Sequence, residues 1–304
     1  MDNYILLVAC LLIGMLVRKS GRFPDNAHAV LNGFLINISL PAVTLLYVHN
    51  LRIDTSLLFP LAMAWVMFAA GFVFFKVLGK IAALPPASVG ALTLTGSLAN
   101  TSFIGLPMIE TFYGQQGLGL GVLIDQMGTY LVLSTLGIFV AALYGQGEGV
   151  SFRGVAKKVL TFAPFIALLV ALLLIPLDYP KWFEGLLRRL GATLVPLALV
   201  SVGYQIQWSA VRGKAAQLCM GLGFKLVLAP AIIALLFAGL LGGRGETVQI
   251  TIFEAAMAPQ IGAAIVAVDH DLDPPLVTLM VGLGIPLSFL TLPLWWVLLK
   301  SIGA

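Results

Sequence analysis

The stretch Gly96-Ser97-Leu98-Ala99-Asn100-Thr101-Ser102-Phe103-Ile104-Gly105-Leu106-Pro107 lies inside an apolar segment that is long enough to cross a bilayer. Its glycines, its proline and its run of small polar residues disfavour a continuous helix. Irregular backbone at membrane depth is tolerated only where it is buried in protein or lines a cavity, because exposed N–H and C=O groups are costly in hydrocarbon. The stretch therefore predicts a broken membrane helix.

A second interruption of the same kind lies in the other half of the chain. It reads Glu254-Ala255-Ala256-Met257-Ala258-Pro259-Gln260-Ile261-Gly262. Interrupted apolar segments in corresponding positions of two halves are typical of the binding site of a secondary transporter. We therefore expect the two breaks to meet near the middle of the membrane.

The composition is that of a polytopic membrane protein. The chain has 304 residues, of which 60% are hydrophobic and 10% are charged, and its mean hydropathy is +1.03. An ordinary soluble domain has about 25% charged residues. The net charge of +4 comes from basic residues in short connections between apolar segments. These residues are typical topology signals, so we expect no binding of nucleic acid.

Apolar runs between charged or turn-forming breaks predict ten membrane spans, since about 20 residues cross a hydrocarbon core about 30 Å thick. The spans are 3–17, 27–48, 56–78, 86–112, 117–144, 155–176, 182–206, 214–240, 247–269 and 274–299. No connection is long enough to hold a soluble domain. The fold class is therefore an all-α membrane protein.

The distribution of Lys and Arg predicts the orientation. One set of alternate connections holds ten basic residues, namely Arg18, Lys19, Arg22, Lys76, Lys80, Arg153, Lys157, Lys158, Arg212 and Lys214. The opposite set holds six, namely Arg52, Lys181, Arg188, Arg189, Arg244 and Lys300. Because cytoplasmic loops are enriched in basic residues, the first set is predicted to be cytoplasmic. Both termini are then outside the cell membrane.

The two halves of the chain resemble each other weakly. Residues 38–43 match residues 193–198 at an offset of 155, and the two breaks then fall nearly in register. Five spans in each half are an odd number, so the second half enters the membrane from the opposite side. The sequence thus predicts an inverted repeat of residues 1–147 and 148–304, with the broken fourth and ninth helices crossing at the midplane.

Several motifs in order along the whole chain resemble the auxin efflux carrier family of secondary transporters, in the bile acid and auxin transporter superfamily. They are Asn37-Ile38-Ser39-Leu40-Pro41-Ala42, residues 100–107, Phe112-Tyr113-Gly114, Asp125-Gln126, residues 254–259 and Leu292-Pro293-Leu294-Trp295. The resemblance implies ten helices in two inverted repeats. It also implies a small carboxylate substrate such as malate or malonate. The chain lacks the long loop of plant hormone exporters, so auxin is one option among several.

The resemblance and the two breaks together predict the substrate site. Half-helix N-termini attract anions through their free N–H groups and their dipole. Asn100, Thr101 and Ser102 are predicted to donate to the substrate or to ligate a coupling ion; alternatively, they only satisfy the unwound backbone. Pro107 and Pro259 are predicted to shape the breaks.

The acidic residues deepest in the predicted spans are Asp125 and Glu254. Either one is a candidate proton carrier, because intramembrane ionisable groups are expensive and usually functional. Alternatively, Glu254 with Gln260 and Asn100 offers the oxygen ligands that suit a Na⁺ ion. The alternatives without a transport role are a structural ion pair for Asp125 and a position near the outer end of the span for Glu254. We expect no cofactor and no metal other than such a Na⁺ ion.

Lys225 lies eleven residues beyond Lys214, which places it ~16 Å into its span at 1.5 Å per residue. It is predicted to pair with Asp125 or Glu254 in preference to contacting the substrate carboxylate. Arg188 and Arg189 are predicted to reach toward the headgroups.

These features predict a secondary active transporter for a small organic anion, coupled to H⁺ or Na⁺ and working by alternating access. An intramembrane enzyme is disfavoured because a nucleophile or metal-binding motif is missing. The alternative is a membrane sensor or channel for a small anion. Carriers of this architecture often form dimers, so we expect a homodimer.

Overall fold

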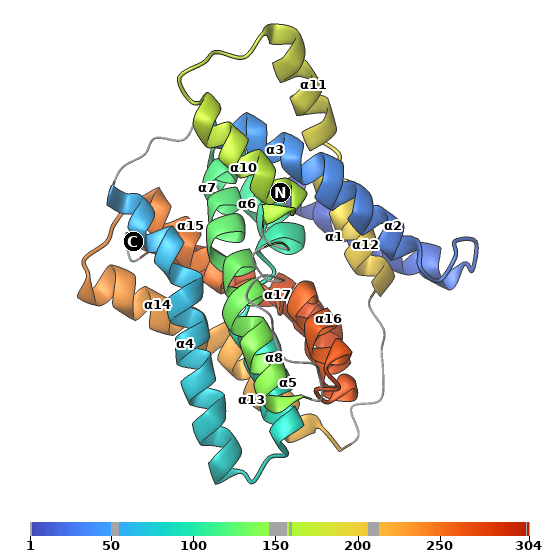
Figure 1. Cartoon of the computed structure of the whole chain (residues 1–304), viewed down its shortest axis with the longest axis vertical. Helices are drawn as coiled ribbons and strands as arrows, with labels where there is room; N and C mark the ends of the chain where they lie inside the picture. Colours follow the sequence, from blue (N-terminus) through green and yellow to red (C-terminus); the bar gives the residue numbers. More distant parts are fainter. Residues whose placement is uncertain are drawn as a thin grey trace. The chain divides into compact units, whose positions relative to one another are not determined.

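The computed structural model describes residues 2–49, 55–145, 157, 160–205, 213–301 and 303, and the regular elements in these ranges are helices (Figure 1). By length and composition, six of them can cross a membrane, namely Ala27–Val48, Leu58–Ile81, Gln115–Tyr144, Lys181–Gln205, Ala215–Leu240 and Pro274–Ser301. A shorter apolar helix covers Ala163–Leu174. The prediction of an all-α multi-pass membrane protein is confirmed at this level. The arrangement of ten helices in an inverted repeat stays a prediction.

Some sequence-based predictions fall outside the described residues. They are the boundary between residues 147 and 148, the beginning of the span at 155–176, and the topology signals Arg52, Arg153, Lys158 and Arg212.

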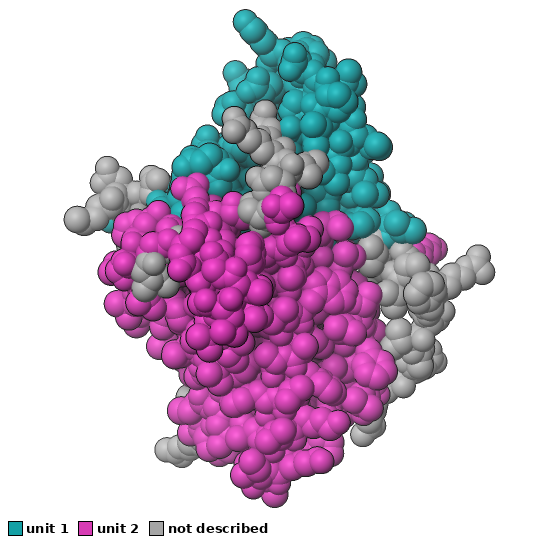
Figure 2. Space-filling model, turned by 90° about the vertical axis from the view of Figure 1, so that its left-hand side faces the viewer, with its two compact units in different colours: residues 1–53, 102–126, 159–206 teal, residues 54–101, 127–158, 207–304 magenta. Residues whose placement is uncertain are grey.

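The chain forms two compact units, each built from three segments (Figure 2). Unit 1 contains residues 1–53, 102–126 and 159–206, and unit 2 contains residues 54–101, 127–158 and 207–304. Each unit thus draws on both halves of the sequence. The compact units therefore do not coincide with the predicted repeats of residues 1–147 and 148–304.

Unit 1 is a bundle of helices whose core is formed by neighbours distant in sequence. Its α-helices are α1 (Asp2–Lys19), α2 (Ala27–Phe34), α3 (Leu40–Val48), α6 (Leu106–Tyr113), α7 (Leu118–Leu123), α10 (Ala163–Leu174), α11 (Lys181–Gly191) and α12 (Leu194–Gln205). Short elements in or bordering this unit are η1 (Leu35–Ser39), η3 (Thr101–Gly105) and η4 (Gln115–Gly117).

Helices α1 and α12 approach each other at two glycines. A Cβ atom on Gly14 would lie 2.1 Å from the carbonyl oxygen of Val200, and one on Gly203 would lie 2.1 Å from that of Leu11. Small residues of this kind let membrane helices pack backbone to backbone, where dispersion replaces the hydrophobic effect as the driving force. The loop before α2 is held to the same pair, since the Tyr204 hydroxyl donates to the Pro24 carbonyl over 3.0 Å.

Unit 2 contains the longest helices and both helix breaks. Its α-helices are α4 (Leu58–Ile81), α5 (Pro86–Ser97), α8 (Ile138–Tyr144), α13 (Ala215–Gly223), α14 (Ala229–Ala234), α15 (Glu246–Ala255), α16 (Ile261–Asp269) and α17 (Pro274–Ser301). Its short elements are η2 (Thr55–Leu57), η6 (Leu133–Gly137), η7 (Phe224–Leu228) and η8 (Leu235–Leu240), while η5 (Ile124–Tyr130) spans the unit boundary.

Several membrane helices contain π-helical segments, in which the backbone hydrogen bonds depart from the regular α-helical pattern. Segment η3 begins at Thr101, η5 contains Asp125 and η7 contains Lys225. Single π-turns inside α-helices are frequent at functional sites. Four predicted site residues therefore lie on such segments, namely Thr101, Ser102, Asp125 and Lys225.

An ion pair ties three elements of unit 2 together at one end. The Asp273 carboxylate, just before α17, accepts hydrogen bonds from Lys214 Nζ over 2.7 Å and from Ser88 Oγ over 2.5 Å. Burial would raise the pKa of Asp273, but these two hydrogen bonds and the Lys214 charge hold that pKa below its ordinary value. The cluster joins the beginnings of α5, α13 and α17.

The close approach of α1 and α12 predicts a large difference between two glycine substitutions. Gly203→Val should lower the free energy of unfolding by roughly 1–3 kcal/mol, since overpacking displaces backbone. Gly33→Ala should be neutral, because a Cβ there meets no atom within 4 Å. Thermal unfolding in detergent measures both, and equal stability of the two variants would contradict the described packing.

The Asp273 cluster predicts an acid-dependent stability. Because the folded-state pKa is depressed, the stabilisation is complete above the unfolded pKa of about 3.9. It is lost as the pH falls through the lower, folded-state pKa. Unfolding midpoints between pH 3 and 7 should therefore fall at the acid end, and Asp273→Asn should flatten this dependence. An unchanged profile in the variant would argue against the ion pair.

Candidate substrate site at the helix crossover

Two helix breaks meet in unit 2. Helix α5 ends at Ser97 and the chain is extended at Leu98, with φ −113° and ψ 134°. Helix α15 ends at Ala255, and α16 begins at Ile261 after Gln260, whose φ of −73° and ψ of 130° are also extended. The predictions of breaks within residues 96–107 and 254–262 agree with these helix ends.

The two extended segments pair with each other as a minimal antiparallel bridge between Ala99 and Pro259. The Asn100 N–H donates to the Ala258 carbonyl over 2.8 Å, and the Gln260 N–H donates to the Leu98 carbonyl over 3.2 Å. These bonds satisfy backbone groups that would otherwise be exposed in a low-dielectric interior. Each helix break therefore leaves backbone groups that need partners, and the crossing of the two breaks supplies some of them.

Local sequence explains where the second break forms. Pro259 has no N–H and disfavours helical geometry at Ala258. The break is also closely packed, since a Cβ on Gly284 of α17 would lie 2.6 Å from Pro259 Cδ. Pro259 thus lies in the bridge, and its role in shaping the break stays a prediction.

Polar side chains flank the crossover and are almost completely buried. The exposed fractions are 2% for Asn100, 0% for Thr101 and 9% for Gln260. A buried amide is costly unless its groups are hydrogen-bonded. Asn100 and Gln260 lie on opposite flanks of the bridge between Ala99 and Pro259.

Several buried side-chain oxygens in unit 2 have no hydrogen-bond partner among the residues that the structure describes. They include Gln260 Oε1, Ser97 Oγ, Thr129 Oγ1 and Gln217 Oε1. A buried acceptor or hydroxyl of this kind costs about 1–3 kcal/mol if it stays unsatisfied. Ser97 and Thr129 were not among the predicted site residues, because a small hydroxyl in an apolar span has no sequence signal beyond its polarity.

Lys225 on η7 is fully buried. Its ammonium donates to the Ala255 carbonyl over 2.7 Å and lies 3.9 Å from the Met67 sulfur. Ala255 is the last residue of α15, so the positive charge lies at the negative end of a half-helix dipole. Glu254, also fully buried, interacts electrostatically with this ammonium. The two opposite charges are thus placed next to the second break.

The remaining predicted residues belong to unit 1. Asp125 is 4% exposed and accepts a hydrogen bond from Gln126 Nε2 over 2.7 Å. Ser102 is partly buried, and Pro107 lies buried in the first turn of α6. The pairing of Asp125 with Lys225 stays a prediction.

The described residues contain no group of three His, Cys, Asp or Glu side chains suited to a metal ion. The Na⁺ site at Glu254, Gln260 and Asn100 stays a prediction.

The family of the chain follows from comparison with known proteins. A sequence model described as "Membrane transport protein" matches residues 2–158 and 150–296. The chain belongs to the auxin efflux carrier family of membrane transport proteins. The broken helices described above are therefore those of a family of transporters.

Two relatives match this transporter along nearly its whole length. A protein of Methanothermobacter thermautotrophicus named an uncharacterized transporter is 26% identical over 302 residues, which cover 98% of each chain. A protein of Methanocaldococcus jannaschii, also named an uncharacterized transporter, is 24% identical over 310 residues, covering 99% of each chain.

The charges beside the crossover predict a strong coupling between two substitutions. Lys225→Met removes the positive charge facing Glu254 and should cost roughly 3–5 kcal/mol of stability. Glu254→Gln in the same chain should recover much of that loss, since both charges are then gone. A double-mutant cycle of unfolding in detergent measures the coupling. Additive losses would show that the two groups do not interact.

Proposed function

We propose that this transporter is a secondary active carrier of a small organic anion, which binds at the crossover and is exposed alternately to each side of the membrane. The observation that carries the proposal is the pair of buried helix breaks joined by the Asn100 and Gln260 N–H groups. A carrier needs a site near mid-membrane that helices can re-expose, and broken helices supply such sites.

The chemistry around the breaks supports an anion as substrate. The first N–H groups of α16 have no acceptor within their own helix, and the helix dipole is positive at this end. The amide of Asn100 supplies further donors, and Thr101 and Ser102 supply hydroxyl groups. We propose a carboxylate, either a dicarboxylate such as malate or malonate or an auxin-like acid.

We propose that Glu254 couples transport to an ion gradient. Protonation of its carboxyl would release Lys225 from charge compensation, so that the ammonium could meet the substrate carboxylate. Alternatively, Glu254, Gln260 and Asn100 ligate a Na⁺ ion. Asp125 is the second candidate for the proton. The carrier is further proposed to be a homodimer of the cell membrane with both termini outside.

Removal of the Asn100 side-chain amide should abolish transport without unfolding the protein. Asn100→Ala should lower uptake at least tenfold, because a hydrogen bond to a charged group contributes about 1.5–3 kcal/mol. The control is Asn26→Ala, an exposed asparagine that makes no capping hydrogen bond to α2.

Uptake of radiolabelled malate, malonate and indole acetate into proteoliposomes, with pH and Na⁺ gradients imposed separately, provides the measurement. Saturable uptake of one acid driven by one gradient supports the proposal, and Glu254→Gln should remove that gradient dependence. Folded protein that moves none of the acids would favour a sensor, and normal uptake by Asn100→Ala would contradict the site.

A further inference from the structure

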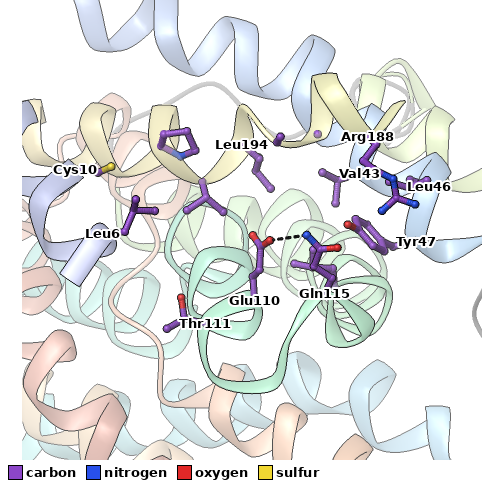
Figure 3. Close-up of a pocket in the computed structure, with 15 residues that line it drawn as sticks. Leu6, Cys10, Val43, Leu46, Tyr47, Glu110, Thr111, Gln115, Arg188 and Leu194 are labelled. Carbon is purple, nitrogen blue, oxygen red and sulfur yellow. Dashed lines mark hydrogen bonds between the residues drawn. The ribbon is translucent and has the colours of Figure 1, made fainter. Parts of the chain in front are cut away.

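Unit 1 contains a cavity of about 350 Å³, and the residues of the crossover bridge do not line it. Its lining residues come from α1, α3, α6, η4, α7, α11, α12 and the residue after α11 (Figure 3). They are Leu6, Cys10, Val43, Leu46, Tyr47, Glu110, Thr111, Gln115, Leu118, Arg188, Gly191, Ala192, Leu194, Val195 and Pro196. All of them belong to unit 1, whereas the crossover bridge belongs to unit 2.

One part of this cavity carries two opposite charges. Glu110 Oε1 accepts a hydrogen bond from Gln115 Nε2 over 3.1 Å. Arg188 lies across from it, with its guanidinium paired to Glu184 over 2.6 Å. The charges of Glu110 and Arg188 both act on the Tyr47 hydroxyl. Tyr47 lies beside Arg188, and Gln115 lies between this pair and Glu110 (Figure 3).

Most of the remaining cavity wall is apolar. Leu6 and Cys10 of α1 lie at the opposite part from Arg188 and Tyr47, with Leu194 between them (Figure 3). Pockets that bind small molecules combine apolar walls with a few placed polar groups and typically measure about 300–1,000 Å³. The cavity has both properties and lies at the small end of this range.

We propose that this cavity binds a small zwitterion with an apolar body, placing its ammonium group at Glu110 and its acidic group at Arg188. The Glu110 carboxylate disfavours a dianion, and the Arg188 guanidinium disfavours a simple amine. A molecule with both charges matches both residues. Its acidic group competes with Glu184 for the guanidinium, while its apolar part lies along Leu194 and Leu6.

Two sources supply this chemistry, namely a free apolar α-amino acid and the ammonium-bearing headgroup of phosphatidylethanolamine. The test for the first is titration calorimetry of the full-length protein in detergent with L-leucine. The matched probes are 4-methylpentanoate, which lacks the ammonium, and 3-methylbutylamine, which lacks the carboxylate. Leucine should bind at least tenfold more tightly than either probe.

The second source is tested by native mass spectrometry of the protein from bilayers containing phosphatidylethanolamine, phosphatidylcholine or phosphatidylglycerol. Preferential retention of phosphatidylethanolamine identifies the lipid as the occupant, because its ammonium can donate hydrogen bonds and that of phosphatidylcholine cannot. Selective binding of leucine identifies the free amino acid. Binding of neither overturns the proposal.

Variants assign the binding to this cavity. Glu110→Gln and Arg188→Gln should each weaken binding of the preferred ligand at least tenfold, and Glu110→Gln keeps a partner for Gln115. Glu184→Gln should strengthen binding, because it removes the competitor for Arg188. Arg189→Gln is the matched control, since this exposed neighbour does not line the cavity. Equal effects of the Arg188 and Arg189 substitutions, with both variants folded by thermal unfolding, would contradict the site.

Discussion

The structure depends on two backbone hydrogen bonds, from Asn100 to Ala258 and from Gln260 to Leu98. A membrane helix can be broken only if the released N–H and C=O groups find partners inside the protein. Here each break supplies a donor and an acceptor to the other. Each break therefore satisfies backbone groups of the other, and Gly284 of α17 packs closely against Pro259 beside this pairing.

The same pairing determines where charge is tolerated. Breaking α15 exposes its negative C-terminal end inside unit 2, and the Lys225 ammonium binds the Ala255 carbonyl there. Glu254 balances that ammonium electrostatically. Desolvated charges are retained only when they are compensated, and retained intramembrane charges usually serve transport. The break after α15, the Lys225 ammonium and the Glu254 carboxylate thus form one electrostatic cluster. A change of charge on either side chain changes the electrostatic energy of the other.

Much of this arrangement could be predicted from the sequence, because its determinants are local. Pro259 and the polar run after Gly96 mark the breaks, and the depth of Lys225 follows from its distance to Lys214. The sequence could not predict the π-helical segments, since tertiary packing decides hydrogen-bond register in a uniformly apolar helix. Nor did it reveal the cavity of unit 1. In the structure Arg188 pairs with Glu184 and lines a cavity with Glu110, a residue 78 positions earlier. Its predicted reach toward the headgroups stays a prediction.

The most direct test of the central claim is solid-state NMR of the transporter in lipid, with ¹³C-carboxylate-labelled substrate and ¹⁵N-labelled asparagine. We expect a dipolar coupling between the substrate carboxylate and the side-chain nitrogen of Asn100. That coupling should disappear in Asn100→Ala. A bound substrate that couples to no asparagine affected by this substitution would contradict the assignment of the crossover as the substrate site.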